Sequence, residues 1–139
     1  MKTGDQVSAA VKPWFDRFSD TLKVAGSGNT AGLIAMVAAM NVVQPSHVHT
    51  VVLLKPTAVI FGLGIFLFGL GYLVFTYAWV YAEHYAGLID PTADKVPEAV
   101  ESIKNASIMH MKRSVYFVIG SAFCFGVGFL TAMVALIRY

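Results

Sequence analysis

The sequence is poor in charge and in cysteine. Only 13% of its 139 residues are Asp, Glu, Lys or Arg, and Cys124 is the single cysteine. A soluble domain carries about 25% charged residues, and half that share cannot cover a globular surface with hydrated side chains. A lone cysteine excludes a disulfide scaffold, and a hydrophobic share of 57% excludes a disordered chain. The composition therefore indicates a single membrane domain.

Two long segments contain no charged side chain. Residues 57–82 form a run of 26, and residues 114–137 form a run of 24. A helix needs about 20 residues to cross the hydrocarbon core of a bilayer, so both segments are predicted to be transmembrane helices. Residues 24–43 are also uncharged, but only the last 13 of them are strongly apolar. This segment is interpreted either as a full span that includes small polar residues or as a short helix tucked against the others.

The charges decide between three spans and two. With three spans, the N-terminal arm and the loop 83–113 share one side and hold eight of the ten basic residues and all eight acidic ones. With two spans, six basic residues lie on one side of the membrane and four on the other, which indicates no preferred orientation. The positive-inside rule then predicts an all-α integral membrane protein with three transmembrane helices. Its N-terminus would be cytoplasmic and its C-terminus outside, as a multi-pass protein of a bacterial-type inner membrane.

The arm itself has helical periodicity. Residues 7–23 place apolar side chains on one face and charges on the other, which predicts an amphipathic helix lying in the headgroup region before the first span. Pro13 favours a regular helix that starts at about residue 12. The alternative is an amphipathic segment packed on other protein. The aromatic residues expected at the membrane interface are Trp14, Phe15, Phe18, Trp79, Tyr81 and Tyr85.

The loop 83–113 is the only sizeable segment outside the spans. A helical pattern resumes at about Pro97 and continues into residues 114–137 without a breaker. The third helix is therefore expected to extend into the cytoplasm by roughly 20–25 Å. Its apolar stripe would pack on the N-terminal helix, on another subunit or on a partner.

Small residues at regular spacing predict where the helices pack, because lipid offers no hydrophobic drive for association. Cys124 lies in one such ridge and is interpreted as a packing residue. The same seams favour a homo- or hetero-oligomer. The predicted packing positions are Gly28, Gly32, Gly62, Gly64, Gly69, Gly71, Gly120, Cys124, Gly128 and Ala132.

Four histidines are the only chemical candidates. His84 and His110 are expected at the cytoplasmic ends of the second and third helices, where a pair could ligate a haem iron. His47 and His49 in the outer loop could hold a metal ion only with further ligands. The preferred interpretation is that none binds a metal, and no cofactor is expected. Catalytic sets and ionisable residues within the spans are both missing, so neither an enzyme nor a secondary transporter is expected.

Two functions remain. The first is a non-enzymatic membrane subunit that assembles through its helix seams and docks a cytoplasmic or membrane partner. The second is a self-assembling protein that permeabilises the membrane, as a holin-like pore or a defence effector does. The lipid bilayer is the expected environment in both cases, and no nucleic acid is expected as a partner.

Overall fold

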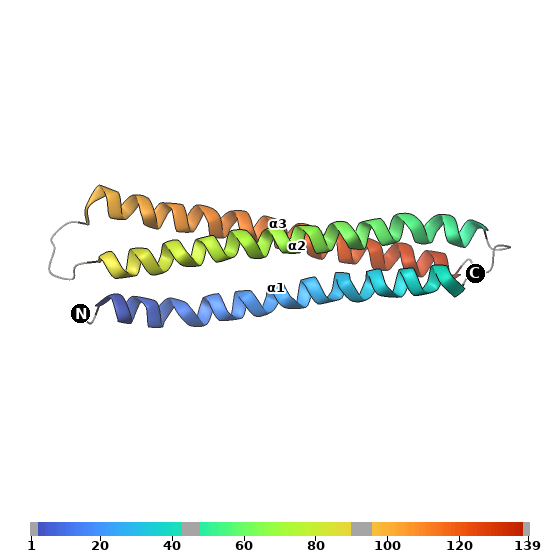
Figure 1. The fold of residues 1–139 in the computed structure, drawn as a ribbon, viewed down its shortest axis with the longest axis horizontal. Helices are drawn as coiled ribbons and strands as arrows, with labels where there is room; N and C mark the ends of the chain where they lie inside the picture. Colours follow the sequence, from blue (N-terminus) through green and yellow to red (C-terminus); the bar gives the residue numbers. More distant parts are fainter. Residues whose placement is uncertain (1–2, 43–47, 90–95, 138–139) are drawn as a thin grey trace.

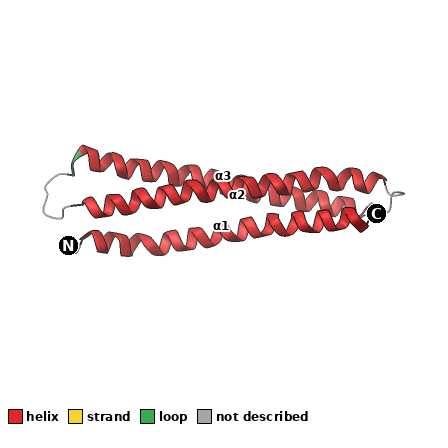
Figure 2. Cartoon of the chain, in the orientation of Figure 1, coloured by secondary structure: helices red, strands yellow, loops and turns green. Residues whose placement is uncertain are grey.

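The described part of the chain forms three long helices, each antiparallel to the next along the chain (Figures 1 and 2). A computed structural model describes residues 3–42, 48–89 and 96–137. Within these ranges the chain is helical and contains no strand, with α1 at Thr3–Val42, α2 at Val48–Leu88 and α3 at Glu98–Ile137. At 1.5 Å per residue each helix is about 60 Å long. α1 and α3 therefore run in the same direction, and α2 runs against both.

Two of the helices are long and apolar enough to cross a membrane. These are Val52–Leu88 within α2, and α3. The helix α1 is not among them, because small polar residues interrupt its apolar segment. The expected all-helical fold is confirmed for the described residues, and the expected third span over residues 24–43 stays a prediction.

The ends of the helices differ from those expected. Pro13 lies inside α1 rather than in its first turn, and Pro56 lies inside α2, which begins at Val48. An interior proline removes one backbone hydrogen bond and costs about 3 kcal/mol. Packing along the full length of neighbouring helices offsets this cost. Rules based on local sequence do not take such packing into account.

The amphipathic arm is not a separate helix. It continues without a break into the apolar segment of α1 and lies alongside α2. The ring of Phe15 lies 5.1 Å from that of Phe75 and 4.5 Å from that of Trp79, and Phe18 lies 5.1 Å from Phe75. The apolar face of the arm is therefore packed on protein, which was the alternative interpretation.

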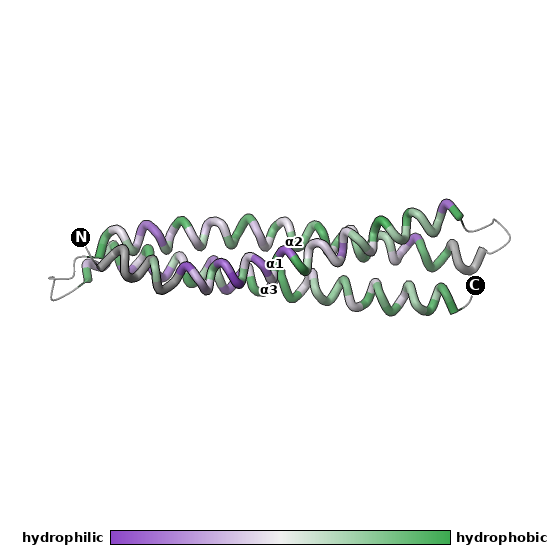
Figure 3. The backbone as a smooth tube through the Cα atoms, turned by 90° about the horizontal axis from the view of Figure 1, so that it is seen from below, coloured by the Kyte–Doolittle hydropathy of each residue, from purple (hydrophilic) through white to green (hydrophobic). Residues whose placement is uncertain are grey.

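The two ends of the bundle differ in polarity. Figure 3 shows hydrophilic segments gathered in the half that contains the N-terminus, whereas the half that contains the C-terminus is largely apolar. In the apolar half, a core cluster joins all three helices through Met36, Leu54, Phe61, Ala132 and Ala135.

Candidate functional site

A ladder of serine hydroxyls joins α3 to α2. Ser107 donates to the carbonyl oxygen of Ala78 at 2.8 Å, Ser114 to that of Gly71 at 2.8 Å, and Ser121 to that of Gly64 at 2.9 Å. The donors are seven residues apart on α3, and the acceptors are seven residues apart on α2. A heptad repeat keeps one seam facing the partner helix along its length.

This seam depends on small residues, because a serine hydroxyl reaches a carbonyl on another helix only when the two backbones lie close together. Ser114 and Ser121 are both fully buried. A Cβ on Gly71 would lie 3.1 Å from the Cβ of Phe117. In the sequence, the seam between α2 and α3 is visible as small residues that repeat every seven positions. The sequence interpretation recognised the glycine pairs on α2 but missed the serine repeat on α3.

Asn29 connects α1 to this seam. Its side-chain nitrogen lies 3.0 Å from the carbonyl oxygen of Ser121, 3.0 Å from the hydroxyl of the same residue and 3.1 Å from the carbonyl oxygen of Ala25. Asn29 has no exposed surface at all. Asn29, Gly64 and Ser121 therefore form a polar junction of three helices, which we call the Asn29 junction.

The carbonyl oxygen of the Asn29 side chain is buried and has no hydrogen-bond donor among the described residues. It is the atom that a Cβ on Gly64 would meet first. This oxygen lies against the Cα of Gly64, where a weak Cα–H···O contact is the remaining interaction. Burying a polar atom without a strong partner costs free energy of folding. The close approach of Gly64 offsets part of that cost, and it requires a residue without a Cβ.

The other predicted packing positions fall into two groups. Gly32 and Gly128 both lie against the ring of Phe61, and Gly28 and Gly120 lie close to Phe125 and Leu67. Cys124 and Ala132 are buried. In contrast, a Cβ on Gly62 or Gly69 would meet nothing within 4 Å, because both face outward from the bundle. Gly26, which the sequence interpretation did not select, lies against Phe68.

The aromatic residues predicted at the membrane interface differ in packing and exposure. Phe15, Phe18 and Trp79 pack between α1 and α2, whereas Trp14 is 72% exposed and faces away. Tyr85 is half-buried near the end of α2. Tyr81 stacks on His110, with ring centroids 5.5 Å apart and an interplanar angle of 3°.

The structure does not pair the histidines. His110 lies between Tyr81 and Tyr77, the latter at 6.2 Å, whereas His84 is exposed further along α2. In the described part of the chain, no three His, Cys, Asp or Glu side chains gather as a metal site would require. His47 and His49 lie outside the residues whose side chains the structure describes.

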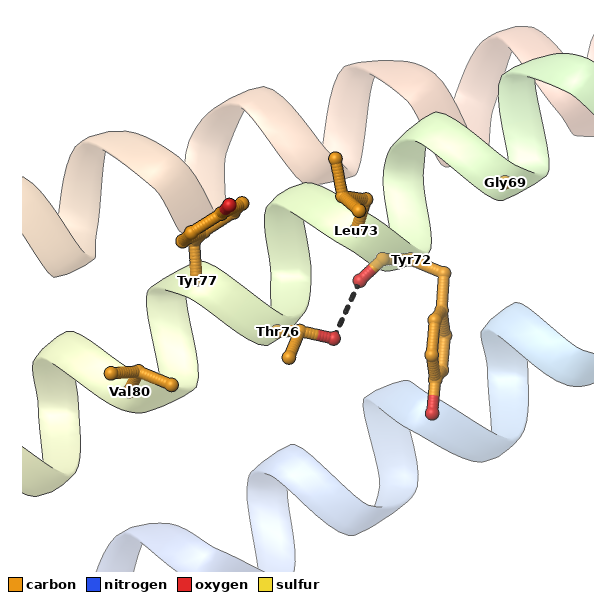
Figure 4. A pocket seen from close by; sticks show the side chains of 6 residues that line it. All are labelled: Gly69, Tyr72, Leu73, Thr76, Tyr77 and Val80. Carbon is orange, nitrogen blue, oxygen red and sulfur yellow. Dashed lines mark hydrogen bonds between the residues drawn. The ribbon is translucent and has the colours of Figure 1, made fainter.

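A shallow groove runs along the outer face of α2 (Figure 4). Its volume is about 430 Å³, and Tyr72 and Tyr77 form its two sides. The hydroxyl of Thr76 donates to the carbonyl oxygen of Tyr72 at 3.0 Å. The full lining is Gly69, Tyr72, Leu73, Thr76, Tyr77 and Val80.

Comparisons with known proteins identify no relative. No family model matches the chain, and neither a curated protein nor a solved structure matches it. The class defined by the fold is an all-helical protein with two helices that are long and apolar enough to span a membrane.

Proposed function

We propose that the chain is a non-enzymatic integral membrane subunit that spans the bilayer three times and docks a partner on its cytoplasmic side. Its proposed location is a bacterial-type inner membrane, with the N-terminus in the cytoplasm and the C-terminus outside. The observation that carries this proposal is the mismatch between the bundle and a bilayer. Helices of about 60 Å are twice as long as the hydrocarbon core of about 30 Å, so half of the bundle must project.

The charges indicate which half projects. On α1 the last charged residue before the apolar segment is Lys23, and on α3 it is Arg113. Asn29 follows Lys23 by six residues, and Ser121 follows Arg113 by eight. Since Asn29 bonds Ser121, these two charges lie at nearly the same depth. The charged half beyond them would form a three-helix stalk in the cytoplasm.

The Asn29 junction supports the third span. An asparagine within a lipid-exposed helix would be costly, but this one is buried and bonded to α3. Gly26 is buried as well. The exposed Ser27 and Thr30 donate their hydroxyls to the backbone carbonyl oxygens of Val24 and Gly26 within α1, so both hydroxyls are hydrogen-bonded. With this cost removed, residues 24–42 are long enough to cross beside the other two helices.

A membrane-permeabilising oligomer is the second candidate. Gly62 and Gly69 face outward with open space, as a seam for another subunit would. Two of the polar side chains that could line a pore, Asn29 and Ser121, are buried and hydrogen-bonded within the bundle. The exposed Thr30 and Thr76 donate their hydroxyls to carbonyl oxygens of their own helices. This internal use of polar groups favours the docking subunit.

The decisive experiment is to purify the full chain alone in mild detergent, determine its subunit number and reconstitute it into dye-loaded liposomes. A docking subunit leaves the liposomes sealed. A stable ring that releases dye without a partner would overturn the proposal in favour of the pore.

A further inference from the structure

The groove on α2 is hollow because of a glycine. A Cβ on Gly69 would meet no atom within 4 Å, so the outer surface of α2 is indented at this position. Leu73 and Val80 continue the floor at helical spacing, and the Thr76 hydroxyl between them is bonded to the backbone of its own helix. The floor is therefore apolar along its length.

The sides of the groove are tyrosines. Figure 4 shows Tyr72 reaching toward α1 and Tyr77 reaching toward α3. Both side chains are about half exposed. Tyrosine is enriched at the level of lipid headgroups, where the ring contacts acyl carbons and the hydroxyl contacts water or phosphate.

The position of the groove along the membrane normal follows from the register of the helices. Ser114 bonds Gly71, so Arg113 lies at the same level along the bundle as the start of the groove, and Lys23 lies at nearly the same level on α1. Side chains on a helix lean toward its N-terminus, which is the charged end for both α1 and α3. Arg113 and Lys23 can therefore extend toward water, and this places the groove across the hydrocarbon–headgroup boundary.

Arg113 follows His110 by three residues on α3, a spacing that places the two side chains near the same face of the helix. His110 contacts Tyr77 and Tyr81 on α2. In the described part of the chain the one ion pair joins Lys23 to Asp20, and Arg113 has no acidic partner. The nearest preceding acid on α3 is Glu101, about three turns away. The guanidinium of Arg113 is thus available to an external anion.

We propose that the groove binds one anionic phospholipid of the cytoplasmic leaflet. The first carbons of an acyl chain lie over Gly69 and Leu73, and Arg113 binds the phosphate beside the hydroxyl of Tyr77. A guanidinium matches phosphate oxygens with two parallel hydrogen bonds, and Lys112 adds a second positive charge that favours a net negative headgroup. This assignment rests on the membrane placement proposed above.

The test uses the full chain in mild detergent with equal amounts of phosphatidylglycerol and phosphatidylcholine, and native mass spectrometry counts the retained lipids. The wild-type chain is expected to retain one lipid, with phosphatidylglycerol favoured about fivefold, the effect of one basic side chain near an anionic surface. Arg113→Gln should remove the preference, and Gly69→Leu should remove the bound lipid by filling the hollow.

Two matched controls accompany these variants. Gly62→Leu also fills open space on the outer face of α2 but lies deeper in the span, and Lys104→Gln removes a charge further from the groove. Both should retain lipid as the wild type does. If the wild type shows no preference, or if either control behaves like its partner variant, the proposal is wrong. Should Arg113→Gln not fold, the wild-type preference must still weaken at about 1 M salt, where surface charges are screened.

Carbonate extraction of the cell membranes separates this proposal from the proposed function. A chain that resists extraction but shows no lipid preference overturns the lipid site alone. A chain that is extracted overturns the membrane placement as well.

Discussion

The side-chain nitrogen of Asn29 lies 3.0 Å from both the carbonyl and the hydroxyl oxygen of Ser121, although 92 residues separate them in the sequence. The same hydroxyl donates to Gly64, so one hydrogen-bonded chain connects all three helices. Because no water competes for these groups in the interior of the bundle, they fix the depth of α1 against the α2–α3 pair.

Asn29→Ala should lower the free energy of unfolding by about 1–2 kcal/mol, because it removes the hydrogen bonds to Ser121. A double-mutant cycle with Ser121→Ala, measured by denaturant unfolding in detergent, should give a coupling energy of about 0.5–1.5 kcal/mol. Additive effects of the two substitutions would show that the two residues do not stabilise one another.

Gly64→Ala should destabilise the chain by about 1–3 kcal/mol, since the new methyl group would overlap with the Asn29 side chain and force α1 away. Gly62→Ala is the matched control, as it lies on the same helix with open space around it. The control should melt at the wild-type temperature or slightly above it, because alanine favours a helix over glycine. Equal melting temperatures for the two variants would contradict the close approach at Gly64.

Ser114→Ala should cost about 1 kcal/mol through loss of the hydrogen bond to Gly71. Ser102 is an exposed serine on the same helix, and its hydroxyl bonds only to Ala99 one turn earlier. Ser102→Ala should therefore leave thermal stability unchanged. The serine ladder would lose its structural role if both variants unfolded at the same temperature.

Phe15→Ala should loosen the charged half of α1, because the ring packs on Phe75 and Trp79. A loss of about 2 kcal/mol of apolar burial should speed amide hydrogen exchange in residues 12–22 by roughly tenfold or more. Trp14→Ala, next to it but facing away, should leave exchange unchanged. Faster exchange in the Trp14 variant alone would place the packed face on the opposite side of α1.

α2 and α3 were predictable from the sequence because each contains an uncharged apolar segment of more than 20 residues. The apolar segment of α1 is shorter, and its prediction depended on helical periodicity and on the distribution of charges. The continuity of α1 across Pro13 was not predictable, since the stabilising contacts come from Phe75 and Trp79 on another helix. Glycines could be selected by their spacing, but spacing does not show which face of a helix packs against its neighbours. Gly64 and Gly62 were therefore equally good candidates for packing positions. The partner of Asn29 lies 92 residues away and follows only from the register of the packed helices.

In the proposed arrangement, three helices cross the membrane and the charged half of the bundle lies in the cytoplasm. Cysteine labelling in intact cells tests it most directly, in a Cys124→Ser background with a single new cysteine at Ser102 or at Tyr139. A membrane-impermeant maleimide should label the Tyr139→Cys variant in intact cells and the Ser102→Cys variant only after permeabilisation. Labelling of both positions from the same side would contradict the three-span arrangement.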